Sequence, residues 1–254
     1  MLSLKARKAL VTGSSRGIGL AIADALSRQG AEVCVHASAP GERLESAVNS
    51  LRSNGGRVES VSGDLSDPAV PARLIRETED KLGPLDILVL NASLQIRAGW
   101  REAKREEFIQ QMQVNVWSCL DMIQQAAPGM AERGRGRILT LGSVQQDRPA
   151  PPLPVYAASK AALMNLVRSI ALDLAPSGVT VNNLSPGLIE TDRNLMVRDT
   201  PDKQAQLLRR VPVGFMGQPE DCVGAALVLC SDAGRYVTGA DWRVDGAWGL
   251  TSAT

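Results

Sequence analysis

Short strand-like runs alternate with longer helical patterns along almost the whole chain of 254 residues. The runs are mostly apolar throughout and are bounded by turn residues, a pattern typical of strands buried on both sides in a parallel sheet. The sequence predicts seven such strands, at Ala9–Thr12, Glu32–His36, Val58–Ser62, Asp86–Leu90, Arg137–Leu141, Val179–Leu184 and Trp242–Val244.

Helical periodicity fills the intervals between these strands. In the third helical stretch, Asp67 followed by Pro68 predicts an N-cap and a proline at the first helical position. Alternation of this kind predicts an α/β fold of the Rossmann type, a doubly wound parallel sheet with helices on both faces. No linker, repeat or low-complexity tract interrupts the pattern, so residues 1–254 are expected to form one domain. The predicted helices are Ile18–Gln29, Arg43–Ser53, Pro68–Leu82, Arg105–Glu132, Tyr156–Leu174, Pro201–Arg210 and Pro219–Ser231.

The composition argues against several kinds of partner. Lysine and arginine number 28 against 27 aspartate and glutamate residues, so the net charge of +1 provides no field for nucleic acid. The four cysteines lack C-x-x-C spacing and there is a single histidine, which argues against a metal site. The apolar runs are too short to cross a bilayer and the first residues do not resemble a signal peptide, so we expect no membrane partner and a reducing, cytoplasmic location.

A glycine-rich turn joins the first predicted strand to the first helix. It reads TGSSRGIG, from Thr12 to Gly19. Gly13 permits the tight turn, Gly17 lets backbone N–H groups approach a pyrophosphate, and Gly19 lets the helix lie close to the sheet. A glycine-rich turn can exist without a ligand, but its place between strand and helix favours a dinucleotide site. The other expected cofactor contacts in this turn are Ser15, Arg16 and Ile18.

A tyrosine and a lysine stand one helical turn apart in the stretch VYAASKAA. Tyr156 and Lys160 are at positions i and i+4 and so share one face of a helix. A neighbouring ammonium stabilises a phenolate, which would make Tyr156 a usable acid and base. Such a pair alone is usually a half-exposed tyrosine beside a solvated lysine. Here Ser143 ends the fifth strand thirteen residues before Tyr156, and Asn115 lies in a long helical stretch, so the set as a whole indicates catalysis.

The T-G-x-x-x-G-x-G turn, taken with these four residues, resembles the short-chain dehydrogenase/reductase family over nearly the whole chain, and most nearly its 3-oxoacyl carrier-protein reductases. The resemblance implies that Tyr156 donates or accepts the proton of the reacting oxygen and that Ser143 orients that oxygen. It implies that Lys160 tunes the tyrosine and binds ribose hydroxyls. It also implies that Asn115 holds a helix distortion and a water of the proton relay.

The end of the second strand bears on the choice of cofactor. NAD-dependent members of the family carry an acidic residue there, whereas this strand ends in His36-Ala37-Ser38. A carboxylate would repel the 2′-phosphate of NADP, so its absence, with Arg16 and Ser38 nearby, favours NADP(H) over NAD(H). His36 could also reach that phosphate, but a histidine at a strand end is more often a packing residue.

The resemblance implies further cofactor contacts in the loops that follow the later strands. Asp64 matches the family residue that contacts the adenine, although an aspartate that only forms a turn is an alternative. The stretch N-A-S after the fourth strand departs from the usual N-N-A-G, and a P-G-x-x-x-T segment after the sixth begins a substrate lid near residues 186–215. The expected contacts beyond the glycine turn are Ser38, Asp64, Leu65, Asn91, Ala92, Tyr156, Lys160, Pro186, Gly187 and Thr191.

Residues that flank these motifs are candidates for a substrate pocket. They suggest a largely apolar or amphipathic carbonyl or alcohol, but they do not separate a 3-oxoacyl thioester from a steroid, a cyclic ketone or a sugar. The candidates are Leu94, Gln95, Ile96, Val144, Gln145, Leu153, Leu188, Leu195 and Met196.

The helix expected over residues 156–174 carries apolar groups nearly all round, more than one face of a sheet needs. A second protein surface is therefore expected against it, and the family resemblance implies a homotetramer.

Three functions remain open from the sequence. The favoured one is an NADPH-dependent carbonyl reductase of the 3-oxoacyl type, or secondary alcohol dehydrogenase. A second is an NAD-dependent dehydrogenase of sugars or steroids. A third is a dinucleotide-sensing binding protein without catalysis, which is disfavoured because Tyr156 and Lys160 are both present.

Overall fold

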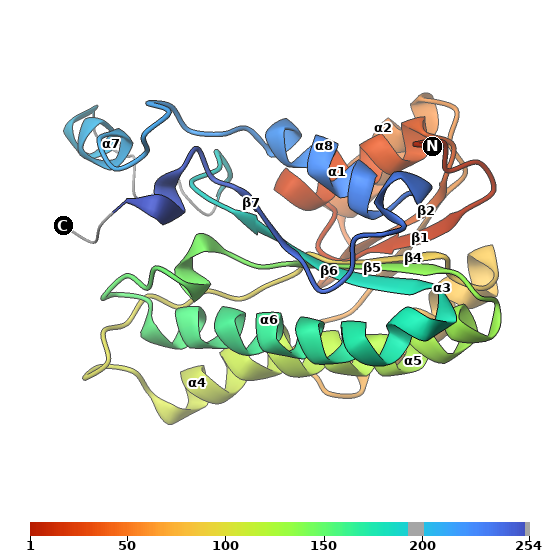
Figure 1. The fold of residues 1–254 in the computed structure, drawn as a ribbon, viewed down its shortest axis with the longest axis horizontal. Coiled ribbons are helices and arrows are strands. Elements are labelled where there is room, and N and C mark those ends of the chain that lie inside the picture. The colour runs from red at the N-terminus through yellow and green to blue at the C-terminus, as the bar shows by residue number, and fades with distance from the viewer. Residues whose placement is uncertain (193–200, 252–254) are drawn as a thin grey trace.

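The computed structural model of the protein describes residues 1–192 and 201–251, with only the backbone course given for 201–204. Its centre is a seven-stranded sheet in the order β3-β2-β1-β4-β5-β6-β7, in which every neighbouring pair is parallel (Figure 1). The strands are β1 Lys8–Val11, β2 Glu32–Ala37, β3 Val58–Ser62, β4 Ile87–Leu90, β5 Gly136–Leu141, β6 Val179–Pro186 and β7 Asp241–Val244.

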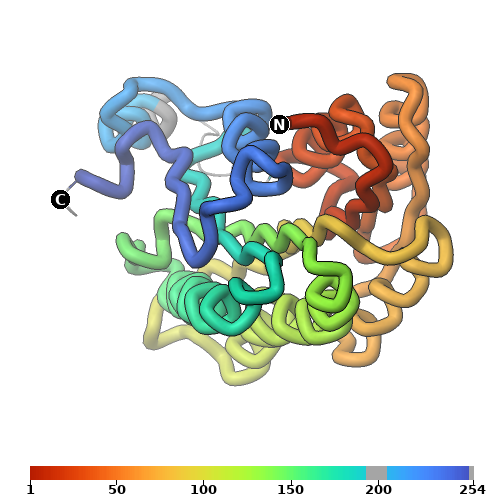
Figure 2. The backbone as a smooth tube through the Cα atoms, turned by 45° about the vertical axis from the view of Figure 1, so that its right-hand side comes forward, coloured from red at the N-terminus to blue at the C-terminus, as the bar shows by residue number. Residues whose placement is uncertain are grey.

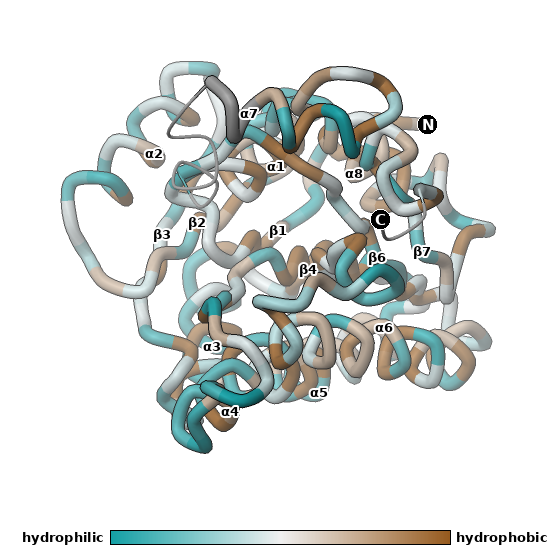
Figure 3. Tube along the Cα trace, turned by 90° about the vertical axis from the view of Figure 1, so that its left-hand side faces the viewer, coloured by the Kyte–Doolittle hydropathy of each residue, from teal (hydrophilic) through white to brown (hydrophobic). Residues whose placement is uncertain are grey.

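Helices cover both faces of the sheet, so the predicted doubly wound α/β fold is confirmed (Figures 1 and 3). One face carries α1 Gly17–Arg28, α2 Glu42–Ser53 and α8 Val223–Leu229. The other carries α3 Val70–Leu82, α4 Arg105–Met112, α5 Ser118–Glu132 and α6 Pro154–Leu174. Figure 2 shows α5 and α6 side by side beneath the sheet, and α7 Pro201–Leu208 stands beyond the sheet, in the predicted lid (Figure 1).

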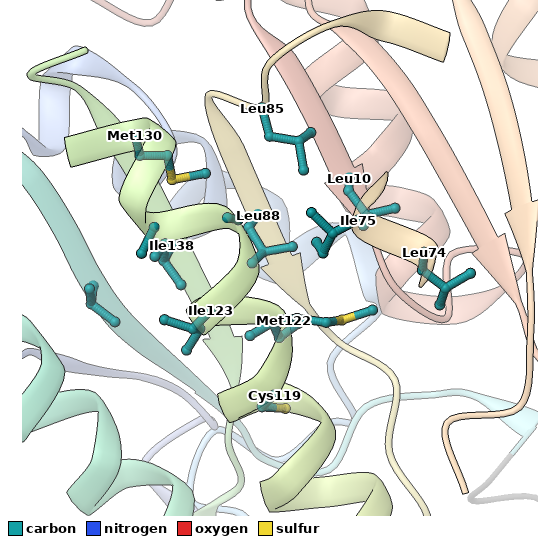
Figure 4. Packing of buried hydrophobic residues seen from close by; sticks show 14 of the residues in the cluster. Leu10, Leu74, Ile75, Leu85, Leu88, Cys119, Met122, Ile123, Met130 and Ile138 are labelled. Atoms are coloured by element: carbon teal, nitrogen blue, oxygen red, sulfur yellow. The ribbon is translucent and has the colours of Figure 1, made fainter. Parts of the chain in front are cut away.

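The central strands are apolar on both faces because each face has its own core. On the side of α3 and α5, Leu10 of β1 and Leu88 of β4 pack with Met122 (Figure 4). On the other side, Val11 and Val89 of the same two strands pack under α1 and α8. Each fully buried side chain of this size contributes roughly 2 kcal/mol from burial, which accounts for the continuous apolar runs in the sequence.

The start of α3 differs from its prediction. The helix begins at Val70, not at Pro68, and Ala69 is its N-cap. The carboxylate of Asp67 does accept a backbone N–H, that of Ala69 at 2.9 Å, while its carbonyl oxygen accepts the N–H of Val70 at 3.1 Å. Asp67 therefore closes a separate turn before the helix, because its side chain competes with the backbone for these donors.

The long helical stretch predicted over Arg105–Glu132 is interrupted in its middle. A π-helical turn at Gln113–Trp117 separates α4 from α5. Such turns are rare and are frequent at functional sites. Asn115 is the central residue of this one and is fully buried.

Within residues 1–192 and 201–251, no helix is long and apolar enough to cross a membrane, and no group of three or more histidine, cysteine or acidic side chains could hold a metal ion. The four cysteines are buried and unpaired. Burial raises the pKa of the Cys34 thiol to about 11 and those of Cys222 and Cys230 to about 12, which keeps these thiols protonated near neutral pH.

Candidate active site

The carboxyl edge of the sheet opens into one large cleft of about 1330 Å³. The strand order reverses direction at β1, which pairs with both β2 and β4, so the loops after β1 and β4 leave toward opposite faces and the space between them stays open. Every cofactor contact expected from the sequence lines this cleft except Gly19. The structure therefore brings residues from across the chain to one site.

Gly19 does not line the cleft but packs behind the glycine turn. A Cβ atom at this position would collide with the side-chain amide of Asn91 and with the carbonyl of Gly13, so only glycine lets α1 lie this close to the turn. Gly13 itself has a φ of +62°, in the left-handed region that favours glycine.

A second set of contacts ties the turn to the loop after β4. The hydroxyl of Thr12 accepts the backbone N–H groups of Asn91 at 2.9 Å and Ala92 at 3.0 Å. The amide of Asn91 donates to the carbonyl oxygens of Thr12 and Gly13 at 2.9 and 3.0 Å. Thr12 is 1% exposed. These bonds hold the two walls of the cleft at a fixed separation.

The turn fits the pyrophosphate of a dinucleotide. The N-cap of α1 is Arg16, which makes no side-chain cap, so no capping side chain satisfies the first backbone N–H groups of the helix. Gly17 and Ile18, the first residues of that helix, line the cleft. An anion placed there would receive these donors and the positive end of the helix dipole.

Charged side chains meet across the mouth of this end of the cleft. Arg16 forms an ion pair with Asp192 at 2.8 Å, and Arg43 of α2 lies 3.7 Å from the same carboxylate oxygen. Thr191 reaches the turn from the same side, since a Cβ on Gly17 would lie 3.4 Å from its Cγ2. Arg43 and Asp192 were not among the residues predicted from the sequence, because nothing in the chain signals a contact between positions 16 and 192.

Three residues expected at the adenosine end line the cleft. Asp64 lines the cleft and its carboxylate also accepts the backbone N–H of Ser66 at 2.9 Å, so it is at once a turn residue and a cleft residue. The side chains of His36 and Ser38 follow at the end of β2, and both residues line the cleft. The strand end carries no carboxylate, as the sequence had indicated.

At the reacting end, Ser143, Tyr156 and Lys160 line the cleft together. Ser143 is the N-cap of a short 3₁₀ turn, and its Oγ accepts the N–H of Gln145 at 3.2 Å. The ammonium of Lys160, a residue 2% exposed, donates to the carbonyl of Leu141 at 2.6 Å. It lies 5.8 Å from the centre of the Tyr156 ring. The predicted juxtaposition of phenol and ammonium is present.

Asn115 lies behind the cleft and not in its lining. Its Oδ1 accepts the N–H of Leu94 and its Nδ2 donates to the carbonyl of the same residue, both at 2.8 Å. Nδ2 also donates to Oγ of Ser159 at 3.0 Å, and that hydroxyl donates to the carbonyl of Tyr156 at 2.7 Å. Asn115 thus links the loop after β4 to the turn of α6 that carries Tyr156. Sequence reasoning missed Ser159, which looks like an ordinary helix residue.

The structure brings only some of the predicted substrate-pocket residues to the cleft. Leu94, Gln95, Gln145, Leu153 and Leu188 line the cleft. Val144 does not, because the 3₁₀ turn after Ser143 directs it into the core, where it is 2% exposed. Ile96 is also absent from the lining, since its backbone is held toward Gln111 of α4. Leu195 and Met196 lie outside the described residues.

The cleft wall near Tyr156 is more polar than the sequence suggested. Lining residues that the sequence analysis did not single out include Arg97, Arg210 and Trp248. None of them belongs to a recognisable motif, and Arg210 and Trp248 come from segments far along the chain.

Comparison with known proteins agrees with this geometry. The family model described as enoyl-(acyl carrier protein) reductase matches residues 13–250. The chain belongs to the short-chain dehydrogenase/reductase family. This family consists of oxidoreductases. The chain is 36% identical to gluconate 5-dehydrogenase of Gluconobacter oxydans (strain 621H) over 246 residues, which are 97% of this chain and 96% of the relative.

Solved structures of the family overlay closely on this chain. A 3-oxoacyl (acyl-carrier-protein) reductase from Agrobacterium tumefaciens C58 with NADP bound has a TM-score of 0.93 at 40% identity, covering 96% of this chain and 95% of that one. A gluconate 5-dehydrogenase from Burkholderia cenocepacia J2315 in complex with NADP and tartrate has a TM-score of 0.93 at 33% identity, covering 99% and 98%. The two names describe different substrates on one scaffold.

The bonds accepted by Thr12 predict a sharp difference between two substitutions. Thr12→Val keeps the shape of the side chain but leaves two N–H groups without their acceptor, which costs about 1–3 kcal/mol for each buried group. We expect this short-chain dehydrogenase/reductase to unfold at lower urea concentration and to bind dinucleotide more weakly as Thr12→Val, whereas Thr12→Ser retains the hydroxyl and most of the stability. Equal urea midpoints for the two variants would contradict the assignment.

Proposed function

We propose that the protein is an NADP(H)-dependent oxidoreductase that interconverts a secondary alcohol and a ketone on a small, polar, negatively charged substrate of the sugar-acid type. The observation that carries this proposal is the substrate end of the cleft, where two arginines, Arg97 and Arg210, share the lining with Ser143 and Tyr156. The reaction type is inferred from the family, and the substrate class is inferred from the residues that line the cleft.

The cofactor preference rests on the charges at the end of β2. No carboxylate stands there to repel a 2′-phosphate, while Ser38, Arg16 and Arg43 line that end of the cleft. Guanidinium groups bind phosphate through charge-assisted hydrogen bonds. The relatives solved with NADP are consistent with the same choice.

The proposed chemistry uses the three residues that line the reacting end. Tyr156 transfers the proton to or from the substrate oxygen through its hydroxyl, and Ser143 donates a hydrogen bond to that oxygen as its charge changes. The ammonium of Lys160 stabilises the phenolate form of Tyr156. Asn115 acts in this proposal through Leu94 and Ser159, as a residue that positions the site. The nicotinamide, when bound, supplies or accepts the hydride.

The proposed substrate class rests on two arginine side chains that have no ionic partner among the described residues. Arg97 and Arg210 are exposed, and neither makes an ion pair or side-chain hydrogen bond with any described residue. A substrate carboxylate would give either guanidinium a bidentate partner. The amide of Gln95, which lines the same cleft, suits a substrate hydroxyl group.

A second candidate is the reduction of a 3-oxoacyl thioester. The relative with the highest identity among those described above, at 40%, carries that name. Leu94, Leu153 and Leu188 offer an apolar strip beside the polar wall that could hold an acyl chain. A binding protein without catalysis has less support, because Tyr156, Lys160 and Ser143 lie together in the cleft.

The first experiment follows NADPH and NADH absorbance against a panel of keto sugar acids, neutral sugars, cyclic ketones, steroids and 3-oxoacyl thioester mimics. We expect one class to consume NADPH and Tyr156→Phe to lose about 100-fold or more of kcat while still binding the cofactor, because general acid catalysis contributes roughly 10²–10⁴-fold. A fully active phenylalanine variant would refute the role of Tyr156. Binding of the cofactor without turnover of any class would favour the sensing alternative.

The two candidate substrate classes can be distinguished by the charge of the substrate. In Arg97→Gln and Arg210→Gln we expect KM for a keto sugar acid to rise about tenfold or more in at least one variant, since a charged hydrogen bond contributes about 1.5–3 kcal/mol. KM for an uncharged keto sugar should change little. Arg235→Gln, which alters an exposed arginine outside the cleft, is the control. Faster turnover of a neutral 3-oxoacyl thioester, unaffected by either substitution, would favour the second candidate.

The oligomeric state is a separate part of the proposal. The face formed by α4, the π turn and α6 exposes large apolar side chains, which supports a homotetramer built on this face. They are Phe108, Ile109, Trp117 and Leu172, with exposed fractions of 47%, 49%, 47% and 81%.

We expect the wild type to have a tetrameric mass at micromolar concentration by light scattering. Trp117→Glu should give a smaller species, because a buried charge without a partner opposes association. Leu2→Glu, at the other side of the molecule, should leave the mass unchanged (Figure 1). A monomeric wild type would overturn this part of the proposal.

A further inference from the structure

The only histidine of the chain lies between two loops of the cofactor end, and the chemistry proposed above makes no use of it. His36 belongs to β2 and is 2% exposed. Its Nδ1 accepts the backbone N–H of Gly13 at 3.0 Å, and its Nε2 lies 3.0 Å from the carbonyl oxygen of Gly63. One rigid ring therefore joins the glycine turn to the loop that follows β3.

These two contacts determine the protonation state of the ring. A backbone N–H can only donate, so Nδ1 must carry a lone pair, and a carbonyl oxygen can only accept, so Nε2 must carry the proton. The neutral imidazole with its proton on Nε2 satisfies both partners. The doubly protonated ring would place its Nδ1–H against the N–H of Gly13, two donors facing each other.

Gly13 and Gly63, the two hydrogen-bond partners of the ring, belong to loops at the cofactor end of the cleft. Gly13 holds the left-handed conformation that begins the turn. The next residue is tied to the same strand position, since the N–H of Ser14 donates to the carbonyl of His36 at 2.9 Å and its hydroxyl accepts the N–H of His36 at 3.0 Å. Gly63 immediately precedes two residues that line the cleft. A shift of the ring would therefore move both walls.

The surroundings of the ring favour its neutral form. Burial lowers the pKa of His36 below its ordinary value of 6.5; the Gly63 carbonyl raises it, Arg73 of α3 lowers it, and Asp64 raises it. Arg73 is itself paired with Glu77 at 2.6 Å. From the glycine turn the ring receives the uncharged N–H of Gly13.

We propose that His36 is a positioning residue of the cofactor site: as a neutral imidazole it holds the glycine turn and the loop after β3 at the spacing that a dinucleotide requires, and its protonation releases Gly13. This inference rests on the proposed function, because it takes the ligand of the cleft to be a dinucleotide. His36 acts through Gly13 and Gly63, so it contributes to binding without touching the reacting atoms.

A matched pair of variants isolates the hydrogen bonds. Asparagine and leucine have nearly the same shape, but His36→Asn offers an acceptor near the position of Nδ1 and His36→Leu offers none. We expect the dissociation constant for NADH at pH 8, measured by titration calorimetry, to rise about tenfold in His36→Leu, the effect of losing one hydrogen bond of about 1.4 kcal/mol. In His36→Asn it should stay within about threefold of the wild-type value.

The pH dependence supplies a readout that a purely structural role would not change. Since the bound form requires a neutral ring, protons compete with the cofactor. The wild-type dissociation constant for NADH should be constant above about pH 6.5 and rise as the pH falls through the lowered pKa of His36. His36→Asn should lack this rise. NADH serves as the probe because it lacks the 2′-phosphate, which titrates near pH 6.

The outcomes are distinguishable. The inference is overturned if His36→Leu, folded by circular dichroism, binds NADH as the wild type does, or if the rise at low pH persists in His36→Asn. The pH profiles of the wild type and His36→Asn decide the question even if His36→Leu does not fold. Failure of the wild type to bind either NADPH or NADH would instead overturn the proposed function, and this inference with it.

Discussion

The hydrogen bonds between Thr12 and the Asn91 loop hold the turn after β1 to the loop after β4, just beyond the end of the two paired strands. β1 pairs with β2 on one side and β4 on the other, and the chain leaves these neighbours toward opposite faces (Figure 3). Thr12 accepts two N–H groups from the loop after β4, and Asn91 returns two bonds to the turn after β1. The turn after β1 lies at the phosphate end of the cleft. Three residues beyond Asn91, the backbone N–H of Leu94 donates to the side chain of Asn115 near the reacting end. The width of the whole cleft therefore depends on this contact.

The buried ammonium of Lys160 has a structural consequence as well as an electrostatic one. Moving a charge out of water is unfavourable unless hydrogen bonds replace the lost hydration. The carbonyl of Leu141, the last residue of β5, provides one such bond at 2.6 Å. Ser143 follows two residues later, while Tyr156 lies on the same helix as Lys160. One bond that offsets the desolvation of the ammonium thus also fixes the helix bearing the phenol against the strand end bearing the serine.

Features that depend on local spacing could be predicted from the sequence. The glycine turn needs only a strand before it and a helix after it, and Tyr156 and Lys160 need only one helical turn. Contacts between distant segments could not be predicted: Arg16 and Asp192 are 176 positions apart, and no pattern links them. Val144 was misplaced because a three-residue 3₁₀ turn reverses which side chains face the core. The start of α3 was misplaced because the carboxylate of Asp67 can close a turn as well as cap a helix.

The near-zero net charge of the chain conceals an uneven distribution along the cleft. At the adenosine end, the carboxylate of Asp192 lies beside both Arg16 and Arg43, and its single negative charge offsets one of the two guanidinium charges. At the substrate end, Arg97 and Arg210 have no ion pair with the residues that the structure describes. An anion is therefore attracted more strongly at the substrate end. A carboxylate beside a guanidinium group repels the incoming anion and so weakens the net Coulomb attraction. A site built to bind only the cofactor would have no need of cations at its far end, and this asymmetry is the physical argument for a charged substrate.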